Sequence, residues 1–279
     1  MEIKEPVIRR DQILFLDDAD FKPEHVCIVT GCGTGIGRAT AVAAAANGLT
    51  VVGLDINPET AAETRAKAEE MGGRMVFVRT DLTADADIEN AVAEAAELGR
   101  IRYLANIAGI QHIDAVEDFP MEKYDLMQRI MLRAPFYLSK LVIPHLRNGA
   151  DGKGAIGHMA SVHAHITTVR KPVYNIVKFG LRALAQSIAA EGEGRIRSFT
   201  VSTGFVQTPL ALNQIPAQAK QRGISEERVV TEVMMGASRV KEMMTPVEVG
   251  NLFMMGFSRF AKYLVGGDLL FDGGMVLTY

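Results

Sequence analysis

The stretch HVCIVTGCGTGIGRATAVAAAANGLTVVGLD, residues 25–55, decides the fold. Its β-branched apolar run at 25–30 predicts a buried strand, the alanine-rich run at 39–46 predicts a helix, and TVVGLD at 50–55 predicts a second strand. Four glycines lie between the first strand and the helix. A glycine turn at this place lets the backbone approach a pyrophosphate, which the free N–H groups at the helix start can bind. The unit therefore predicts a dinucleotide site.

Asp55 ends the second predicted strand, 24 positions after Gly31. A carboxylate at this place can accept hydrogen bonds from both ribose hydroxyls of an adenosine and would repel a 2′-phosphate. Ile56 and Asn57 follow, so no basic side chain comes next to bind that phosphate. We therefore expect NAD rather than NADP as the cofactor. Asp81 follows the third predicted strand and is a candidate for either an adenine contact or a turn cap.

The remainder of the chain continues to alternate strands and helices. Further strands are expected at 75–80, 102–109, 154–161, 196–203 and 269–274, and helices at 58–72, 85–99, 121–147, 174–190, 209–244 and 245–257. This alternation predicts an α/β fold of Rossmann type, a doubly wound parallel sheet with helices on both faces. One domain is expected over residues 25–279. Residues 1–24 form an extension before it, for which a strap over the fold, an oligomer contact and a flexible tail all stay open.

Composition narrows the classes of partner. The chain has 279 residues, a net charge of −3 and a pI near 6.1, so no basic excess exists to neutralise a nucleic acid. The only cysteines are Cys27 and Cys32, which favours a reducing cytoplasm over a disulfide framework. The apolar run at 13–16 is too short for a signal-peptide core, and no apolar stretch approaches a membrane span. We expect neither nucleic acid nor membrane as a partner.

Tyr174 and Lys178 are four positions apart in a predicted helix and therefore share one face. A phenol has an unperturbed pKa of about 10, which a neighbouring ammonium would lower toward neutral pH. Ser161 ends the preceding predicted strand, where open α/β sheets bind their ligands. Its hydroxyl can hold a substrate oxygen beside the tyrosine. With the glycine turn, these residues predict a general acid/base site next to a dinucleotide.

With these motifs the chain resembles the short-chain dehydrogenase/reductase family over about residues 25–279. The matching motifs are TGCGTGIG at 30–37, Asp55, the DL pair at 81–82, NIAG at 106–109, the set of Ser161, Tyr174 and Lys178, and GFVQTP at 204–209. The resemblance implies that Tyr174 is the acid/base, that Lys178 binds the nicotinamide ribose and tunes the tyrosine, and that Ser161 positions the substrate. The cofactor contacts it implies are Gly31, Gly33, Thr34, Gly35, Ile36, Gly37, Asp55, Asp81, Leu82, Asn106, Ala108, Gly109, Tyr174, Lys178, Gly204, Val206 and Thr208. No metal site is expected.

Within that family the chain resembles the bacterial D-3-hydroxybutyrate dehydrogenases, in NIAGIQHIDAVEDFP (106–120), SVHAHITTVRKPVY (161–174) and the segment 208–234. The resemblance implies that Gln111, His163, Lys171 and Gln214 hold a substrate carboxylate, that Phe205 forms an apolar wall, and that Ser161 and Tyr174 contact the reacting oxygen. Donors of this kind form charge-assisted hydrogen bonds to a carboxylate. The activity implied is NAD-dependent interconversion of (R)-3-hydroxybutyrate, or a related short 3-hydroxy acid, and its 3-oxo acid.

Two other functions stay open. One is oxidation or reduction of a different compound, such as a sugar, a cyclic alcohol or a 3-oxoacyl compound. The other is a non-catalytic NAD-binding protein.

Met131 stands where many members of the family have an asparagine that feeds a relay water to the lysine, so either a backbone carbonyl holds that water or the relay differs. His165 and Arg170 match no family role, and we expect them to be structural or solvent-facing.

The family resemblance also implies an assembly and a lid. Homotetramers would form through the helices at about 121–147 and 174–190 and through the C-terminal strand. Residues at about 209–244 would form the substrate lid. The apolar character of these segments is compatible with the tetramer and with the lid. It does not require either, because a buried core face has the same composition.

Overall fold

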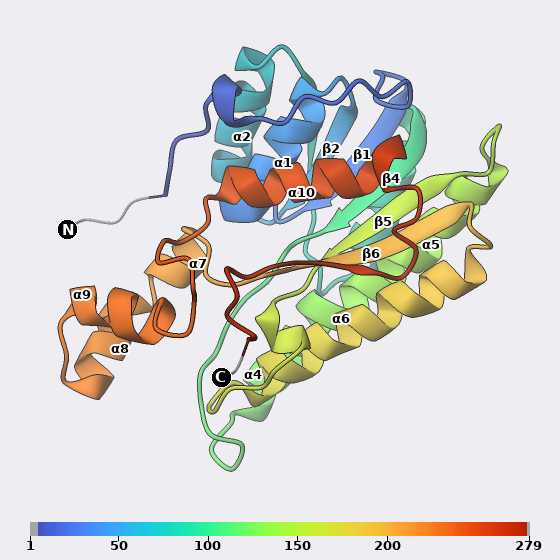
Figure 1. Cartoon of the computed structure of the whole chain (residues 1–279). Helices are drawn as coiled ribbons and strands as arrows, with labels where there is room; N and C mark the ends of the chain where they lie inside the picture. The colour runs from blue at the N-terminus through green and yellow to red at the C-terminus, as the bar shows by residue number, and fades with distance from the viewer. Residues whose placement is uncertain (1–4, 278–279) are drawn as a thin grey trace.

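Seven parallel strands form one sheet in the order β3-β2-β1-β4-β5-β6-β7 in this computed structural model, which describes residues 5–277 (Figure 1). The strands are β1 (His25–Thr30), β2 (Thr50–Asp55), β3 (Arg74–Arg79), β4 (Arg100–Asn106), β5 (Gly154–Met159), β6 (Ile196–Thr203) and β7 (Asp268–Phe271). The sheet confirms the predicted Rossmann-type fold. Strand order reverses between β1 and β4, and their carboxyl ends therefore border the crevice where doubly wound sheets bind ligands.

Helices cover both faces of the sheet (Figure 1). One face carries α1 (Gly35–Ala46), α2 (Pro58–Glu70) and α10 (Pro246–Phe257), and the other carries α3 (Asp85–Leu98), α5 (Ala134–Asn148) and α6 (Pro172–Glu191). Buried apolar side chains form a separate core cluster on each face. The first face is packed closely, because a Cβ at Gly250 of α10 would lie 3.1 Å from the carbonyl carbon of Ala39 in α1. Across residues 5–277, no helix is long and apolar enough to cross a membrane.

The helix expected over 121–147 is interrupted. It consists of α4 (Met121–Gln128), a π-helical segment η2 (Arg129–Arg133) and α5. In the π-segment the N–H of Ala134 donates to the carbonyl of Arg129, five residues earlier. Pro135 has no N–H to donate, so the carbonyl of Met131, four residues before it, lacks its normal helical donor. A proline in the sequence therefore explains an irregular backbone next to Met131.

The expectation that residues 209–244 are helical is confirmed for most of 209–234, with breaks at 213–214 and 223–225, and is wrong for residues 235–244. The segment contains α7 (Pro209–Leu212), α8 (Ile215–Arg222), α9 (Glu226–Arg228) and the π-helical η4 (Val229–Met234), followed by irregular backbone. There the N–H groups of Arg239 and Val240 donate to the carbonyl of Gly273 instead of to helical partners. Tertiary bonding to the C-terminal loop thus replaces the helix. Figure 1 shows α8 and α9 away from the sheet, where the segment has its own small apolar cluster.

The first described residues, 5–24, form a strap along the face that carries α1 and α10 (Figure 1). Ile8, Ile13 and Phe21 are buried in the core of that face. The backbone N–H of Leu14 donates to the side-chain oxygen of Asn251 in α10 at 2.9 Å. This N-terminal strap also contains the 3-10 turn η1 (Arg10–Gln12), and two further such turns, η3 (Val162–Ala164) and η5 (Arg259–Ala261), follow in the chain.

Candidate functional site

A cavity of about 360 Å³ lies at the carboxyl ends of the central strands. It is lined by residues from the predicted cofactor site and from the predicted substrate site. The expected site residues that line it are Gly31, Thr34, Gly35, Ile36, Gly37, Asp55, Asp81, Leu82, Ala108, Gly109, Gln111, Ser161, His163, Lys171, Tyr174, Lys178, Gly204, Phe205, Val206, Thr208 and Gln214. Residues spread over 184 positions of sequence therefore meet around one space.

Two expected cofactor residues do not line this cavity. The backbone N–H of Gly33 donates to Asp55 Oδ2, and a Cβ at Gly33 would lie 2.4 Å from the Thr60 hydroxyl oxygen. Asn106 is buried at the end of β4, with its amide nitrogen 3.3 Å from Nδ1 of the buried His158. Both residues therefore support the cavity wall from behind.

The glycine turn lies against the NIAG turn with no room for side chains. Gly31 has a φ of +67°, and a Cβ there would lie 2.9 Å from the Ala108 Cα. A Cβ at Gly37 would lie 1.9 Å from the Gly31 carbonyl oxygen. The Thr30 hydroxyl accepts hydrogen bonds from the N–H groups of Ile107 at 2.8 Å and Ala108 at 3.0 Å, which ties the two turns together. No side chain of these glycines therefore covers the backbone at the start of α1, whose N–H groups are of the kind that bind phosphate.

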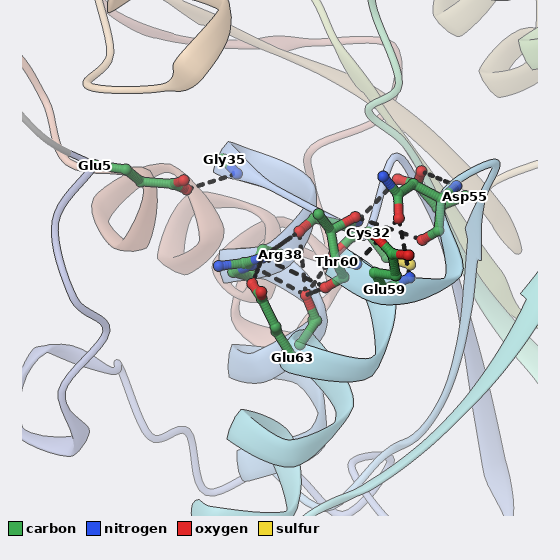
Figure 2. Close-up of polar contacts among 11 residues, drawn as sticks. Glu5, Cys32, Gly35, Arg38, Asp55, Glu59, Thr60 and Glu63 are labelled. Carbon is green, nitrogen blue, oxygen red and sulfur yellow. Dashed lines mark hydrogen bonds and ion pairs between the residues drawn. The ribbon is translucent and has the colours of Figure 1, made fainter.

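Figure 2 shows the polar contacts around Asp55. Its carboxylate accepts from the N–H groups of Gly33 at 2.8 Å and Asn57 at 3.0 Å, which hold it at the cavity edge. The guanidinium of Arg38 points elsewhere, donating to the Gly33 carbonyl at 2.6 Å and to Glu63 at 2.7 Å. Arg38 does not line the cavity. The part of the cavity beside Asp55 thus has a fixed acceptor, and Arg38 contributes no cation to it.

Asp81 caps a turn at the edge of the cavity. It lines the cavity, and its carboxylate caps a turn by accepting from the N–H of Thr83 at 2.8 Å and the Thr83 hydroxyl at 2.7 Å. These hydrogen bonds lower the pKa of Asp81.

Ser161, Tyr174 and Lys178 all line the cavity. Ser161 follows β5 by two residues, and α6 begins at Pro172, whose fixed φ suits the first helical turn. The Lys178 Nζ atom lies 5.2 Å from the centre of the Tyr174 ring. It also donates to the carbonyl of Met159 at 2.6 Å, a partner that nothing in the side-chain pattern indicated.

The protonation states of this pair differ from the simple expectation that Lys178 lowers the pKa of Tyr174. Burial raises the pKa of Tyr174 to about 12, although a hydrogen bond with Ser161 acts in the opposite direction. Burial also lowers the pKa of Lys178 to about 7. Removal from water disfavours both charged forms, so desolvation outweighs the attraction between ammonium and phenolate in the protein alone. Tyr174 is therefore protonated at neutral pH.

Lys171 and His163 form a polar group beside Tyr174. Burial lowers the pKa of Lys171, whose Nζ atom lies 5.8 Å from the centre of the Phe205 ring. His163 Nδ1 is 3.0 Å from the Ser161 hydroxyl, and its Nε2 is 2.9 Å from the Thr168 hydroxyl. Burial, and then the positive charges of the two lysines, lower the pKa of His163 to about 3. The imidazole is neutral at physiological pH, so one ring nitrogen donates and the other accepts.

Gln111 and Gln214 also line the cavity, and their side chains lie next to each other. The Gln214 amide nitrogen donates to the carbonyl of Leu210 at 2.6 Å and lies 3.5 Å from the Gln111 side-chain oxygen. The Gln111 amide nitrogen is buried and has no hydrogen-bond partner among residues 5–277. A buried donor without a partner is costly unless a ligand or water accepts from it.

Met131 is buried, lines the cavity and leaves its sulfur 3.3 Å from a Cβ built at Gly109. A thioether cannot donate to water, so the side chain does not replace the amide of an asparagine. The backbone beside it contains the π-segment described above, which Pro135 of α5 follows.

His165 and Arg170 lie outside the cavity lining, as expected from the sequence. His165 Nε2 is 2.6 Å from Asp268 Oδ2 on β7, and its Nδ1 is 3.3 Å from the guanidinium of Arg182. Arg170 has a φ of +62° and pairs with Asp114 at 3.3 Å on the surface. His165 therefore links the loop that contains Ser161 and His163 to the edge of the sheet.

With these motifs on this fold, the chain belongs to the short-chain dehydrogenase/reductase family. The family model that matches residues 31–276 is described as enoyl-(acyl carrier protein) reductase. Members of this family generally use nicotinamide cofactors and are usually oligomers that bind small molecules.

Three relatives indicate the range of reactions. A D-beta-hydroxybutyrate dehydrogenase of Rhizobium meliloti is 31% identical over 88% of this chain and 96% of its own length. A D-beta-hydroxybutyrate dehydrogenase of Cupriavidus necator is 30% identical over 89% of this chain and 96% of its own length. A 2,5-dichloro-2,5-cyclohexadiene-1,4-diol dehydrogenase of Sphingobium indicum is 31% identical over 89% of this chain and 95% of its own length. The chain is therefore an oxidoreductase, and identity alone does not select the substrate.

Proposed function

We propose that the protein is an NAD-dependent dehydrogenase of short 3-hydroxy acids, with (R)-3-hydroxybutyrate and acetoacetate as its substrate pair. The observation that carries this proposal is the polar group beside Tyr174. Lys171, His163, Gln111 and Gln214 line the same cavity as the acid/base set. Among residues 5–277, no carboxylate pairs with Lys171, and an anionic substrate would supply one. The names of the relatives in Rhizobium and Cupriavidus support the same substrate.

The donors suit a nicotinamide dinucleotide. Backbone N–H groups of Gly35, Ile36 and Gly37 would bind its pyrophosphate, and Asp55 would accept from its adenosine ribose. When bound, the dinucleotide supplies the acceptor for a hydride. We propose NAD over NADP, since the Asp55 charge would repel a 2′-phosphate while Arg38 is held by Glu63.

In oxidation, the Tyr174 oxygen takes the hydroxyl proton of the substrate, and in reduction it returns that proton to the carbonyl oxygen. Ser161 holds the reacting oxygen, and its contact with His163 orients the serine hydroxyl. The raised pKa of Tyr174 suits the reduction of the 3-oxo acid at neutral pH. Oxidation requires the phenolate and therefore is expected to become faster as the pH rises.

A carboxylate clamp would also set the position of the substrate. A short hydroxy acid has few atoms to bind, and its carboxylate is its strongest handle. Binding it between Lys171 and the two glutamines would place the carbinol carbon beside Tyr174, and positioning of this kind contributes directly to rate. Because Met131 cannot donate to water, the proton route from Lys178 would depend on a water held by a backbone carbonyl.

A neutral cyclic alcohol is the second candidate substrate. The Sphingobium relative, named for a cyclic diol, is as similar as the hydroxybutyrate dehydrogenases. The half-buried Lys171 is the feature that disfavours it, because an uncharged diol would leave that ammonium without a counter-charge.

We propose that residues 209–244 form the lid of the cavity and that the chain assembles as a homotetramer. Leu210, Ala211 and Gln214 of this segment line the cavity. Large apolar side chains are exposed on α5, α6 and β7, where the tetramer would form; these are Phe136, Ile176, Phe179, Leu270 and Phe271. Burial of such residues in an interface would stabilise the assembly.

The experiment is a comparison of the wild type with Lys171→Met. Wild-type protein with NAD and (R)-3-hydroxybutyrate is expected to form NADH at neutral to alkaline pH. Loss of a charge-assisted hydrogen bond worth about 1.5–3 kcal/mol is expected to raise KM for the hydroxy acid roughly 10- to 100-fold. The turnover of a neutral secondary alcohol should change little.

Arg170→Gln is the matched control, since it removes a positive charge one residue away that does not line the cavity. Its KM values should stay near those of the wild type. An equal loss for acidic and neutral substrates in Lys171→Met would refute the carboxylate role. Absence of NADH formation in the wild type would refute the substrate assignment.

A further inference from the structure

The N-terminal strap places an acid at the start of α1. Glu5 Oε1 accepts a hydrogen bond from the backbone N–H of Gly35 at 2.7 Å, as Figure 2 shows. Gly35 is the first residue of α1, and the side chain of its N-cap Thr34 makes no capping hydrogen bond. The first turn of α1 also contains no acidic residue. The positive end of this helix is therefore neutralised by a carboxylate from a segment 30 positions earlier in the chain.

This carboxylate lies where the pyrophosphate of the cofactor is proposed to bind. Gly35, Ile36 and Gly37 line the cavity, and the Thr208 methyl group is 3.1 Å from a Cβ built at Gly35. One N–H group cannot donate fully to a carboxylate and a phosphate at the same time, and the two anions repel each other. Glu5 and a dinucleotide therefore compete for the same donor.

The rest of the strap is anchored behind Glu5. Ile8 is buried, the Arg10 guanidinium donates to the carbonyl of Met71 at 2.7 Å, and Leu14 bonds to Asn251. Between Glu5 and these anchors, Val7 is 72% exposed. Three residues of extended chain span about 10 Å. Glu5 can therefore leave Gly35 by rotation of residues 5–7 while the anchored part of the strap stays in place.

We propose that Glu5 is a built-in competitor of the cofactor. Its carboxylate accepts from the N–H of Gly35 in the free protein and leaves when a dinucleotide binds. The proposal rests on the dinucleotide site proposed above. Only the fraction of molecules with Glu5 displaced is competent to bind, so the apparent Kd is raised by the inverse of that fraction. The same contact satisfies the helix start in the free protein and helps the cofactor to leave.

The test compares the affinities of three ligands by calorimetry. NAD and ADP-ribose both contain the pyrophosphate, whereas adenosine contains no phosphate. Glu5→Ala is expected to lower the Kd of NAD and ADP-ribose about three- to tenfold and to leave that of adenosine unchanged. Glu5→Gln keeps an acceptor without the charge and should give a smaller gain. Asp11→Asn is the control, because it removes an exposed charge of the same strap whose contact is with Arg9.

Each contrary outcome points to a different error. Equal affinity of the wild type and Glu5→Ala for NAD would overturn the competition. A gain for adenosine as large as that for ADP-ribose would also overturn it, since the variant would then be acting by loosening the site. Failure of every protein to bind NAD would instead reject the dinucleotide site and with it the proposed function.

Discussion

Replacement of Lys178 by methionine is expected to stabilise the protein at neutral pH while abolishing its activity. The unfolded chain binds the lysine proton with a pKa near 10.5, whereas the native protein binds it with a pKa of about 7. Between these values the unfolded state carries more protons, so wild-type stability should rise with pH across this window. At about 1.4 kcal/mol per pKa unit, the buried ammonium lowers the free energy of unfolding by up to about 5 kcal/mol below pH 7.

Methionine has a similar length and no charge, but it cannot donate to the Met159 carbonyl. Leaving that buried acceptor without a partner costs about 1–3 kcal/mol. The net gain for Lys178→Met at pH 7 is therefore about 2–4 kcal/mol. It should fall as the pH rises and become a net loss of about 1–3 kcal/mol near pH 10.5, where only the lost hydrogen bond remains. Urea unfolding at intervals between pH 6 and 10 measures both values, and steady-state assays measure the loss of turnover.

Other titrating groups do not alter this comparison. Lys171 is present in both proteins, so its contribution to the free energy of unfolding cancels. The lowered pKa of His163 changes the free energy of unfolding only below the usual histidine pKa of 6.5. Lys123→Met, which removes an exposed lysine, serves as the control and should show no gain that depends on pH. A stability difference between Lys178→Met and the wild type that is the same at pH 7 and pH 10 would refute the reasoning. A variant less stable than the wild type at pH 7 would also refute it.

Two further outcomes are expected. Asp55→Asn should lower the ratio of kcat/KM with NAD to kcat/KM with NADP by about tenfold or more, because the substitution removes the charge that repels a 2′-phosphate. An unchanged ratio would show that other residues discriminate between NAD and NADP. His165→Ala should lower kcat/KM for the hydroxy acid about three- to tenfold and also lower the melting temperature, because it releases the loop that contains Ser161 and His163 from Asp268. Normal catalysis with only a lower melting temperature would show that His165 is structural alone.

The part of the fold that could be predicted from sequence is the part with a local signature. The run 25–55 contains β1, the glycine turn, α1 and β2, and each depends on residues that are neighbours in the chain. Tyr174 and Lys178 share a helix face for the same reason. The glycine turn and the pair of Tyr174 and Lys178 were also predicted to surround one cavity with Ser161. That prediction follows from strand order, since parallel strands bring their carboxyl ends to one edge.

Features that depend on distant partners could not be predicted in this way. Nothing near residues 235–244 indicates that Arg239 and Val240 bond to Gly273 instead of continuing a helix. Pro135 is visible in the sequence, but the π-segment it accompanies was not expected. The pKa values of Tyr174 and Lys178 depend on burial by several elements, so the charge pattern alone led to the wrong sign for Tyr174.

The anchors of the N-terminal strap also affect how the chain must fold. Leu14 bonds to Asn251 and Asp18 bonds to the backbone of Arg259, so the strap needs partners that are synthesised 237 and 241 positions later in the chain. Until then the apolar side chains of Ile8, Ile13 and Phe21 have no completed core to enter. Contacts of such sequence separation form slowly. The strap is therefore expected to dock after the rest of the domain, and Glu5 would reach Gly35 among the last steps of folding.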